Sequence, residues 1–196
     1  MCRMATADIA MIGVAAGWFL FGASLVPMLR RPRTGSQKRS PVSLGAMALQ
    51  GLGFAIVWGW TRPIGLPLLA VPPGIEPFIA ATAVGLAIAS GLFGIWAVRT
   101  LGRQWSLVAR LADRHELITT GPYAIVRHPI YTAMFGLLIA TGMARSEFIA
   151  TVIAAATYTG ATMMRVGSEE RLLASAFGSA HVDYKRRVRA FIPGVW

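Results

Sequence analysis

The most constraining feature of this chain is a series of five long apolar stretches separated by polar segments. A helix rises about 1.5 Å per residue, so roughly 20 apolar residues span the hydrocarbon core of a bilayer. The stretches cover residues 9–29, 42–60, 78–98, 129–144 and 147–164. Backbone polar groups find no water inside the lipid, so each stretch is predicted to be helical. The expected fold class is an all-α integral membrane protein with about five transmembrane helices.

The connections between the stretches suggest how the chain is organised. Only Arg145, Ser146 and their neighbours join the fourth and fifth stretches, which predicts a tight helical hairpin. The first stretch is too long for the apolar core of a typical signal peptide and lacks a small-residue cleavage site, so we expect a retained helix. We divide the chain into residues 1–98, with three helices, and residues 99–196, with a polar loop, the hairpin and a polar C-terminal region.

The distribution of charge favours a membrane protein over a soluble one. A net charge of +11 in a soluble domain would suggest binding to nucleic acid. Here 55% of the residues are hydrophobic, only 14% are charged, and the basic residues fall between the apolar stretches. The expected partner is therefore the lipid bilayer, and no nucleic-acid partner is expected.

The positions of the basic residues predict the orientation in the membrane. Cytoplasmic loops carry more Lys and Arg than loops on the opposite side. Of the 19 Lys and Arg residues, all except Arg3, Arg62 and Arg145 follow the first, third or fifth stretch. This pattern places the N-terminus outside and the C-terminus in the cytoplasm, as in a multi-pass protein of a bacterial-type inner membrane.

Polar residues concentrate in two segments, about 99–127 and 165–196, which this orientation places on the same side. Pro129 opens an apolar run and suits the first turn of a helix, so His128 is expected near a helix N-terminus, which attracts anions. Arg165 and Glu169 are four residues apart and share one helical face. Spacing alone is equally compatible with residues that have no role in a site. Arg165 would then be an ordinary interfacial Arg beside a solvated Glu169, and His115 and His128 would be ordinary interfacial histidines.

Other chemistries find little support in the sequence. The only cysteine is Cys2, so this chain can form neither an internal disulfide nor a thiolate metal site. Its three histidines form no HExxH motif and no repeated pairs, so no metal site is predicted. No GxGxxG motif follows a strand-like run, which argues against a soluble dinucleotide-binding fold.

Two ordered motifs carry a more specific signal. They are HELITTGPYAIVRHPIYTAMFG at residues 115–136 and RVGSEERLLASAFGSAHVDYKRRVRAFIP at residues 165–193. Together they resemble the isoprenylcysteine carboxyl methyltransferase family, including its bacterial and archaeal members. The resemblance covers about residues 115–193, and the first three predicted helices carry no comparable signature.

The resemblance implies a methyltransferase that uses S-adenosyl-L-methionine and methylates a carboxylate or another lipophilic acceptor at the membrane interface. It implies a cytoplasmic C-terminal region that binds the cofactor, and Arg165 is implicated with the acceptor. Arg165 and Glu169 are then the candidate catalytic residues. The implied cofactor-binding residues are His115, Glu116, Leu117, Ile118, Tyr123, His128, Pro129, Ile130, Tyr131 and Glu169.

Three other functions are also compatible with the sequence. Phospholipid N-methyltransferases share parts of the C-terminal pattern, and NADPH-dependent membrane reductases resemble it at a distance. A non-enzymatic protein whose Arg-rich tail binds lipid head groups is compatible with the composition but leaves the ordered motifs unexplained. The sequence indicates neither the identity of the acceptor nor the oligomeric state.

Overall fold

The structure, a computed structural model, describes residues 2–29, 41–63, 74–102 and 117–192. These residues form helices, and their only β-type pairings are two isolated bridges. The elements are α1 (Cys2–Leu29), α2 (Pro41–Gly59), α3 (Glu76–Leu101), the 3-10 helix η2 (Gly121–Ala124), α4 (Pro129–Arg145), α5 (Phe148–Phe177) and α6 (Ser179–Arg187). The predicted all-α class is therefore confirmed for the described part of the chain.

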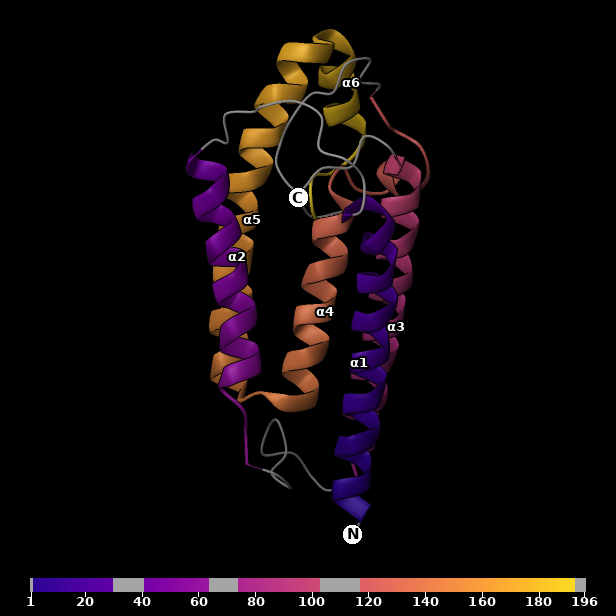
Figure 1. The fold of residues 1–196 in the computed structure, drawn as a ribbon, viewed down its shortest axis with the longest axis vertical. Coiled ribbons are helices and arrows are strands. Elements are labelled where there is room, and N and C mark those ends of the chain that lie inside the picture. The colour runs from indigo at the N-terminus through magenta and orange to yellow at the C-terminus, as the bar shows by residue number, and fades with distance from the viewer. Residues whose placement is uncertain (1, 30–40, 64–73, 103–116, 193–196) are drawn as a thin grey trace.

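The five long helices run side by side and alternate in direction (Figure 1). Two pairs form the sides of the bundle: α1 packs against α3, and α2 packs against α5. Helix α4 lies between the pairs and contacts all four of the other long helices. The short α6 lies at the end of the bundle where α3 and α5 finish and α4 begins.

Three helices are long and apolar enough to cross a membrane, through Thr6–Val26, Val42–Gly59 and Glu76–Leu101. Large hydrophobic side chains stand on their outer faces; Phe19 is 75% exposed and Phe78 is 73% exposed. Such surfaces are stable against lipid rather than water. The chain is a helical membrane protein, and its first three predicted spans coincide with α1, α2 and α3.

The last two predicted spans correspond to α4 and α5. Only Ser146 and Glu147 lie between these helices, so the tight hairpin is confirmed. Helix α4 has 17 residues, whereas α5 has 30 and continues well beyond the apolar stretch at 147–164. Part of the segment that the sequence suggested as a polar tail is therefore a helical extension of the bundle.

Close packing of α1 on α3 depends on glycine. A Cβ atom on Gly17 would lie 2.5 Å from the backbone oxygen of Ala87, and one on Gly91 would lie 2.7 Å from the backbone oxygen of Gly17. Small residues let helix backbones approach in this way inside membranes. Gly22 on the same helix differs, because an added Cβ would meet nothing within 4 Å.

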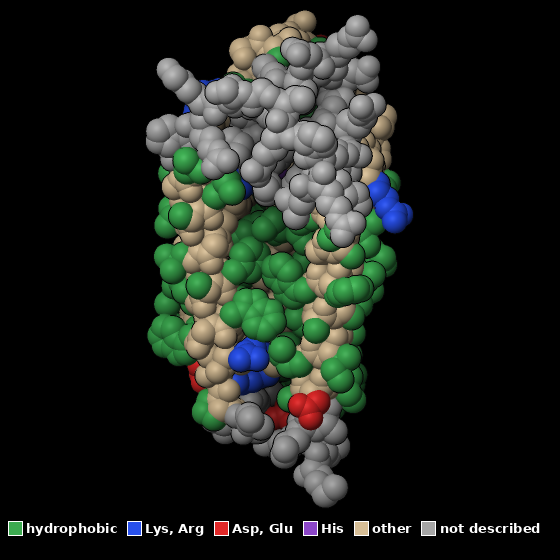
Figure 2. All heavy atoms as spheres, in the orientation of Figure 1, with side chains coloured by type: hydrophobic (Ala, Val, Ile, Leu, Met, Phe, Trp, Pro, Cys, Tyr) green, Lys and Arg blue, Asp and Glu red, His purple; other side chains and the backbone are tan. Residues whose placement is uncertain are grey.

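Aromatic rings connect the two sides of the bundle. The ring of Trp18 on α1 meets Phe54 on α2 edge to face at 5.1 Å, and Phe54 meets Tyr158 on α5 at 5.4 Å. Trp18 Nε1 also donates a hydrogen bond to Thr141 Oγ1 on α4 at 3.0 Å. On the face seen in Figure 2, the space between the two sides is hollowed and lined mainly by hydrophobic side chains.

The glycine contact gives a direct test of the packing. Gly17→Val should lower the free energy of unfolding by about 1–3 kcal/mol, since the added methyl groups overlap the α3 backbone. Gly22→Val is the matched control and should change it by less than about 0.5 kcal/mol. Thermal unfolding of both variants in detergent measures the difference. Equal unfolding temperatures would contradict the close α1–α3 approach.

Candidate active site at one end of the bundle

The two polar segments meet at the end of the bundle where α4 begins. The backbone N–H of Arg127 donates to the carbonyl of Arg189 at 2.8 Å, and that of His128 donates to Ala190 at 2.9 Å. Thr132 Oγ1, in the first turn of α4, donates to the Phe191 carbonyl at 2.6 Å. The chain after α6 therefore lies along the chain before α4, as expected for segments that emerge on the same side.

A short turn leads into this junction. Gly121 has a φ of 60°, a conformation that L side chains rarely adopt, and is the first residue of η2. Tyr123, in η2, is buried, and its carbonyl accepts a 2.6 Å hydrogen bond from the hydroxyl of Tyr184 on α6. Burial raises the pKa of Tyr184 to about 12, so this hydroxyl stays a donor at neutral pH. Tyr184 thus fastens α6 to the turn.

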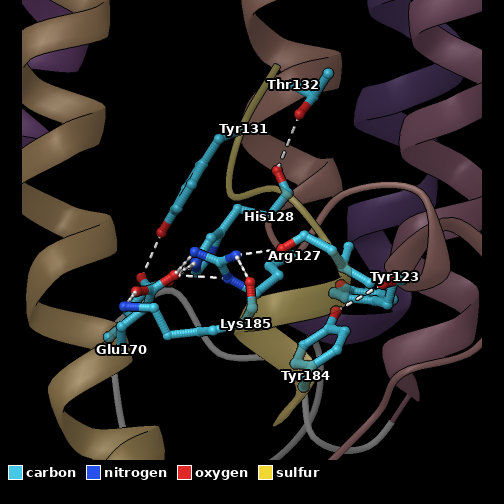
Figure 3. A network of polar contacts seen from close by, with 10 residues as sticks. Tyr123, Arg127, His128, Tyr131, Thr132, Glu170, Tyr184 and Lys185 are labelled. Atoms are coloured by element: carbon cyan, nitrogen blue, oxygen red, sulfur yellow. Dashed lines mark hydrogen bonds and ion pairs between the residues drawn. The ribbon is translucent and has the colours of Figure 1, made fainter. Parts of the chain in front are cut away.

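Arg127 and Glu170 form the first part of a charged cluster (Figure 3). Arg127 Nε and Nη2 lie 2.8 and 2.5 Å from Glu170 Oε1, and Lys185 Nζ lies 2.8 Å from Glu170 Oε2. Arg127 Nη1 also donates to the Val188 carbonyl. Burial opposes ionisation of Glu170, but its hydrogen bonds and the Arg127 charge outweigh burial and hold the pKa of this carboxyl well below its usual range.

His128 lies between two carboxylates. Its Nδ1 is 3.4 Å from Glu169 Oε2 and its Nε2 is 3.6 Å from Glu170 Oε1. The ring is buried and stacks on Tyr131 at 5.8 Å with an interplanar angle of 14°. Burial disfavours the imidazolium, yet the two carboxylates together raise the pKa of His128 above its ordinary value. At 3.6 Å, Nε2 makes no hydrogen bond in the described structure.

Glu169 and Arg165 form the second part of the cluster. The hydroxyl of Tyr131 donates to Glu169 Oε1, and Arg165 Nη2 lies 3.6 Å from the same oxygen. The Arg165 guanidinium also stands over the Tyr131 ring, 5.0 Å from its centre, a cation–π arrangement. Burial disfavours the charged form of Glu169, but its contacts with His128, Tyr131 and Arg165 lower the pKa of this carboxyl. The predicted Arg165–Glu169 pair is present; Arg165 is buried and Glu169 is partly buried.

Sequence reasoning missed a residue of α2 in this cluster. Arg165 Nη1 donates to Gln50 Oε1 at 3.1 Å, and Gln50 Nε2 donates to Thr162 Oγ1 at 2.9 Å. Gln50 is 4% exposed. The available signal was that Gln50 is the only amide side chain in the five apolar stretches, and polar groups inside membranes tend to be functional. The sequence also did not assign Arg127, Glu170, Tyr184 or Lys185 to the site.

The remaining predicted site residues lie in the first turn of α4, in the chain before η2 or outside the described residues. Pro129 is buried and Ile130 partly buried, both in the first turn of α4. Leu117 and Ile118 are partly buried in the chain that leads to η2. His115 and Glu116 lie outside the described residues. Tyr123, His128, Tyr131, Arg165 and Glu169 are the predicted residues that lie at the junction of η2, α4, α5 and the C-terminal segment.

Comparison with known proteins identifies relatives of this region. Residues 83–175 match the isoprenylcysteine carboxyl methyltransferase family. The nickel-cobalt-cadmium resistance protein NccN of Alcaligenes xylosoxydans xylosoxydans is 28% identical over 135 residues, 68% of this chain and 62% of that protein. The cobalt-zinc-cadmium resistance protein CzcN of Cupriavidus metallidurans is 30% identical over 109 residues, 55% of this chain and 50% of that protein.

A protein-S-isoprenylcysteine O-methyltransferase of Schizosaccharomyces pombe is 34% identical over 79 residues, 40% of this chain and 34% of that protein. The chain thus spans less than two thirds of the length of each of these three relatives. The family match contains α4 and most of α5 but neither α2 nor α6.

The two buried histidines of the described chain should affect stability with opposite signs. The pKa of His128 is raised above 6.5, so its stabilising contribution is present below about pH 6.5 and is lost as pH rises through the folded value. Burial lowers the pKa of His181, so its contribution is present above about pH 6.5 and is lost as pH falls.

Thermal unfolding in detergent between about pH 4 and 9 measures these contributions, that of His181 below about pH 6.5 and that of His128 above it. His128→Gln should make the unfolding temperature fall less steeply, or rise, with increasing pH. His181→Gln should make it fall more steeply. Parallel pH profiles for both variants and the wild type would contradict the assigned directions.

Proposed function

We propose that this chain, whose residues 83–175 match the isoprenylcysteine carboxyl methyltransferase family, is an integral membrane methyltransferase that uses S-adenosyl-L-methionine. The observation that carries the proposal is a cluster of both charge signs, buried or partly buried, at one end of an apolar bundle. Arg127, His128, Arg165, Glu169 and Glu170 all belong to it. Buried charges are costly, so a cluster of this size favours a ligand-binding role.

The residues of the cluster fit this cofactor chemically. S-adenosyl-L-methionine carries a carboxylate, an ammonium group and a cationic sulfur. The carboxylates of Glu169 and Glu170 suit its cationic groups, and Arg127 and His128 suit its carboxylate. His128 Nε2, buried and without a hydrogen bond of its own, is a donor available to a ligand when the ring is protonated. The faces of aromatic rings such as Tyr131 favour a nearby cation.

The cofactor, when bound, supplies a methyl group activated by attachment to a cationic sulfur. The chain's own residues then need to position the acceptor and keep water away. A carboxylate acceptor has no proton to lose at neutral pH, so no general base is needed. Arg165 is proposed to orient that carboxylate, and burial of the site limits the hydration that would weaken it as a nucleophile.

The acceptor is proposed to be a lipophilic carboxylate that reaches the site from the bilayer. The hydrophobic hollow between the two sides of the bundle supports an entry route for an apolar chain (Figure 2). The positive charge of Arg165 favours an anionic acceptor over the amine required for phospholipid N-methylation. The names of NccN and CzcN refer to metal resistance; in the described residues of this chain no group of three His, Cys, Asp or Glu could hold a metal ion.

The orientation proposed with this function has five spans. The N-terminus is outside, and the charged cluster, α6 and the C-terminus are on the cytoplasmic side. Arg62 and Arg145 lie at the opposite end of the bundle, where Arg62 Nη2 donates to the Ala144 carbonyl at 2.8 Å. Most basic residues then lie in the cytoplasm, in agreement with the usual charge bias.

Cysteine labelling tests this orientation. In a Cys2→Ser background, a membrane-impermeant maleimide should label Gly74→Cys on intact cells, because Gly74 is exposed at the outer end. Thr120→Cys and Ser179→Cys are exposed at the other end and should be labelled only after permeabilisation. If Thr120 and Ser179 proved to lie on opposite faces of the membrane, they could not belong to one site.

Arg165→Ala tests the division of roles in the site. We expect this variant to lose methyl transfer by at least about 100-fold, equivalent to about 2.7 kcal/mol, while it still binds S-adenosylhomocysteine in calorimetry. Arg171→Ala, on the exposed part of the same helix, is the matched control and should keep both properties.

The same preparations test the competing functions. A thermal shift with S-adenosylhomocysteine and none with NADPH is the expected result, because a ligand that binds only the folded protein raises its apparent stability. Stabilisation by NADPH alone would favour a reductase. Transfer of labelled methyl groups to phosphatidylethanolamine but not to an isoprenylcysteine analogue would overturn the choice of a carboxylate acceptor.

A further inference from the structure

Gln50, which lies outside the family match, contacts Arg165, the residue proposed to orient the acceptor. Resting on the proposed methyltransferase function, we propose that Gln50 on α2 is a positioning residue that fixes the Arg165 guanidinium and leaves its charge available to the acceptor. Three hydrogen-bonding side chains, Gln50, Thr162 and Arg165, lie together where α2 packs on α5.

The amide of Gln50 is held at both ends. Its Nε2 donates to Thr162 Oγ1 at 2.9 Å, which turns Oε1 toward Arg165 Nη1 at 3.1 Å. Thr162 and Arg165 are three residues apart and share one face of α5, so one amide side chain can bridge them. Thr162 is fully buried and Gln50 nearly so. A side chain fixed in this way has few alternative rotamers. The Arg165 guanidinium that it contacts is restricted in the same way.

Three groups contact the Arg165 guanidinium from different sides. Glu169 lies beside Nη2, Gln50 beside Nη1, and the ring of Tyr131 beneath the guanidinium plane. An arginine carries five N–H donors in a rigid plane, so a carboxylate can bind Arg165 beside the partners that it already has. Gln50 thus supports one edge of the fork and defines the direction from which an acceptor approaches.

The neutrality of Gln50 is central to the inference. An amide oxygen accepts the Nη1 hydrogen bond without adding a negative charge. A carboxylate in the same place would form a second ion pair with Arg165 and repel an anionic acceptor in a region of low dielectric. One carboxylate, Glu169, already lies within 3.6 Å of this guanidinium. The choice of Gln over Glu therefore suits an arginine that must still attract an anion.

The test compares variants of nearly equal shape. Gln50→Glu keeps the size of the side chain and the Nη1 contact but adds charge, so the KM for a carboxylate acceptor should rise about tenfold. Its kcat and its affinity for S-adenosylhomocysteine should change by less than about twofold. Gln50→Leu keeps the charge of Arg165 but loses its orientation, so kcat should fall. Ser43→Ala, another buried polar position of α2, is the control and should leave all three unchanged.

If Gln50 had a purely structural role, the KM for the carboxylate acceptor would be the same in Gln50→Glu and in the wild type. That result overturns the proposal. A second test uses Thr162→Val, which removes the hold on the amide but leaves Gln50 and Arg165 in place. If Gln50 acts through its orientation, the losses in kcat/KM for Thr162→Val and Gln50→Leu should be non-additive. Additive losses would contradict the proposal even if Gln50→Glu did not fold.

The outcomes separate this inference from the proposed function. If the wild-type protein neither binds S-adenosylhomocysteine nor transfers a methyl group, the proposed function fails. The contact itself is then tested by thermal unfolding of Gln50→Leu, Arg165→Leu and the double variant. Shifts that simply add would show that the two residues are uncoupled, and the positioning role would fail on its own evidence.

Discussion

The structure depends on the burial of opposite charges at the end of an apolar bundle. Removing a carboxylate or guanidinium from water costs several kcal/mol per ion, and only close partners offset that cost. Glu169 and Glu170 are consecutive residues, so their side chains leave α5 about 100° apart. Glu169 therefore contacts Arg165 and Tyr131, and Glu170 contacts Arg127 and Lys185. A single turn of helix thus organises two groups of partners.

His128 couples these two groups. Its ring nitrogens approach one carboxylate each, and its backbone N–H bonds to the segment that follows α6. The start of α4 is therefore fixed by contacts with both α5 and the C-terminal segment. A change in the protonation of His128 alters the balance of charge beside both carboxylates at once. A ligand that brought its own charge into this place would act on the same balance, which is why a cluster of this type suits a charged cofactor.

Part of this arrangement could be predicted because it depends on local sequence. The hairpin follows from the short link around Ser146, the start of α4 from Pro129, and the Arg165–Glu169 pair from its spacing. The helical extension of α5 could not be found from apolar length, since the apolar stretch ends where charges begin although the helix continues. Pairing of Arg127 with Glu170 and of Gln50 with Arg165 joins residues 43 and 115 positions apart, and no local pattern encodes such contacts.

The first three helices show why a sequence signature can be weak where a structural role is strong. A helix that faces lipid on one side and another helix on the other needs only apolar and small residues, and many sequences meet that need. Gly17 and Gly91 satisfy it for α1 and α3 through close backbone contact. In α2 the requirement is specific at one position, because Gln50 must reach a charged group of α5 without a charge of its own. A lone polar residue in an otherwise permissive helix is therefore more informative about the site than the apolar residues around it.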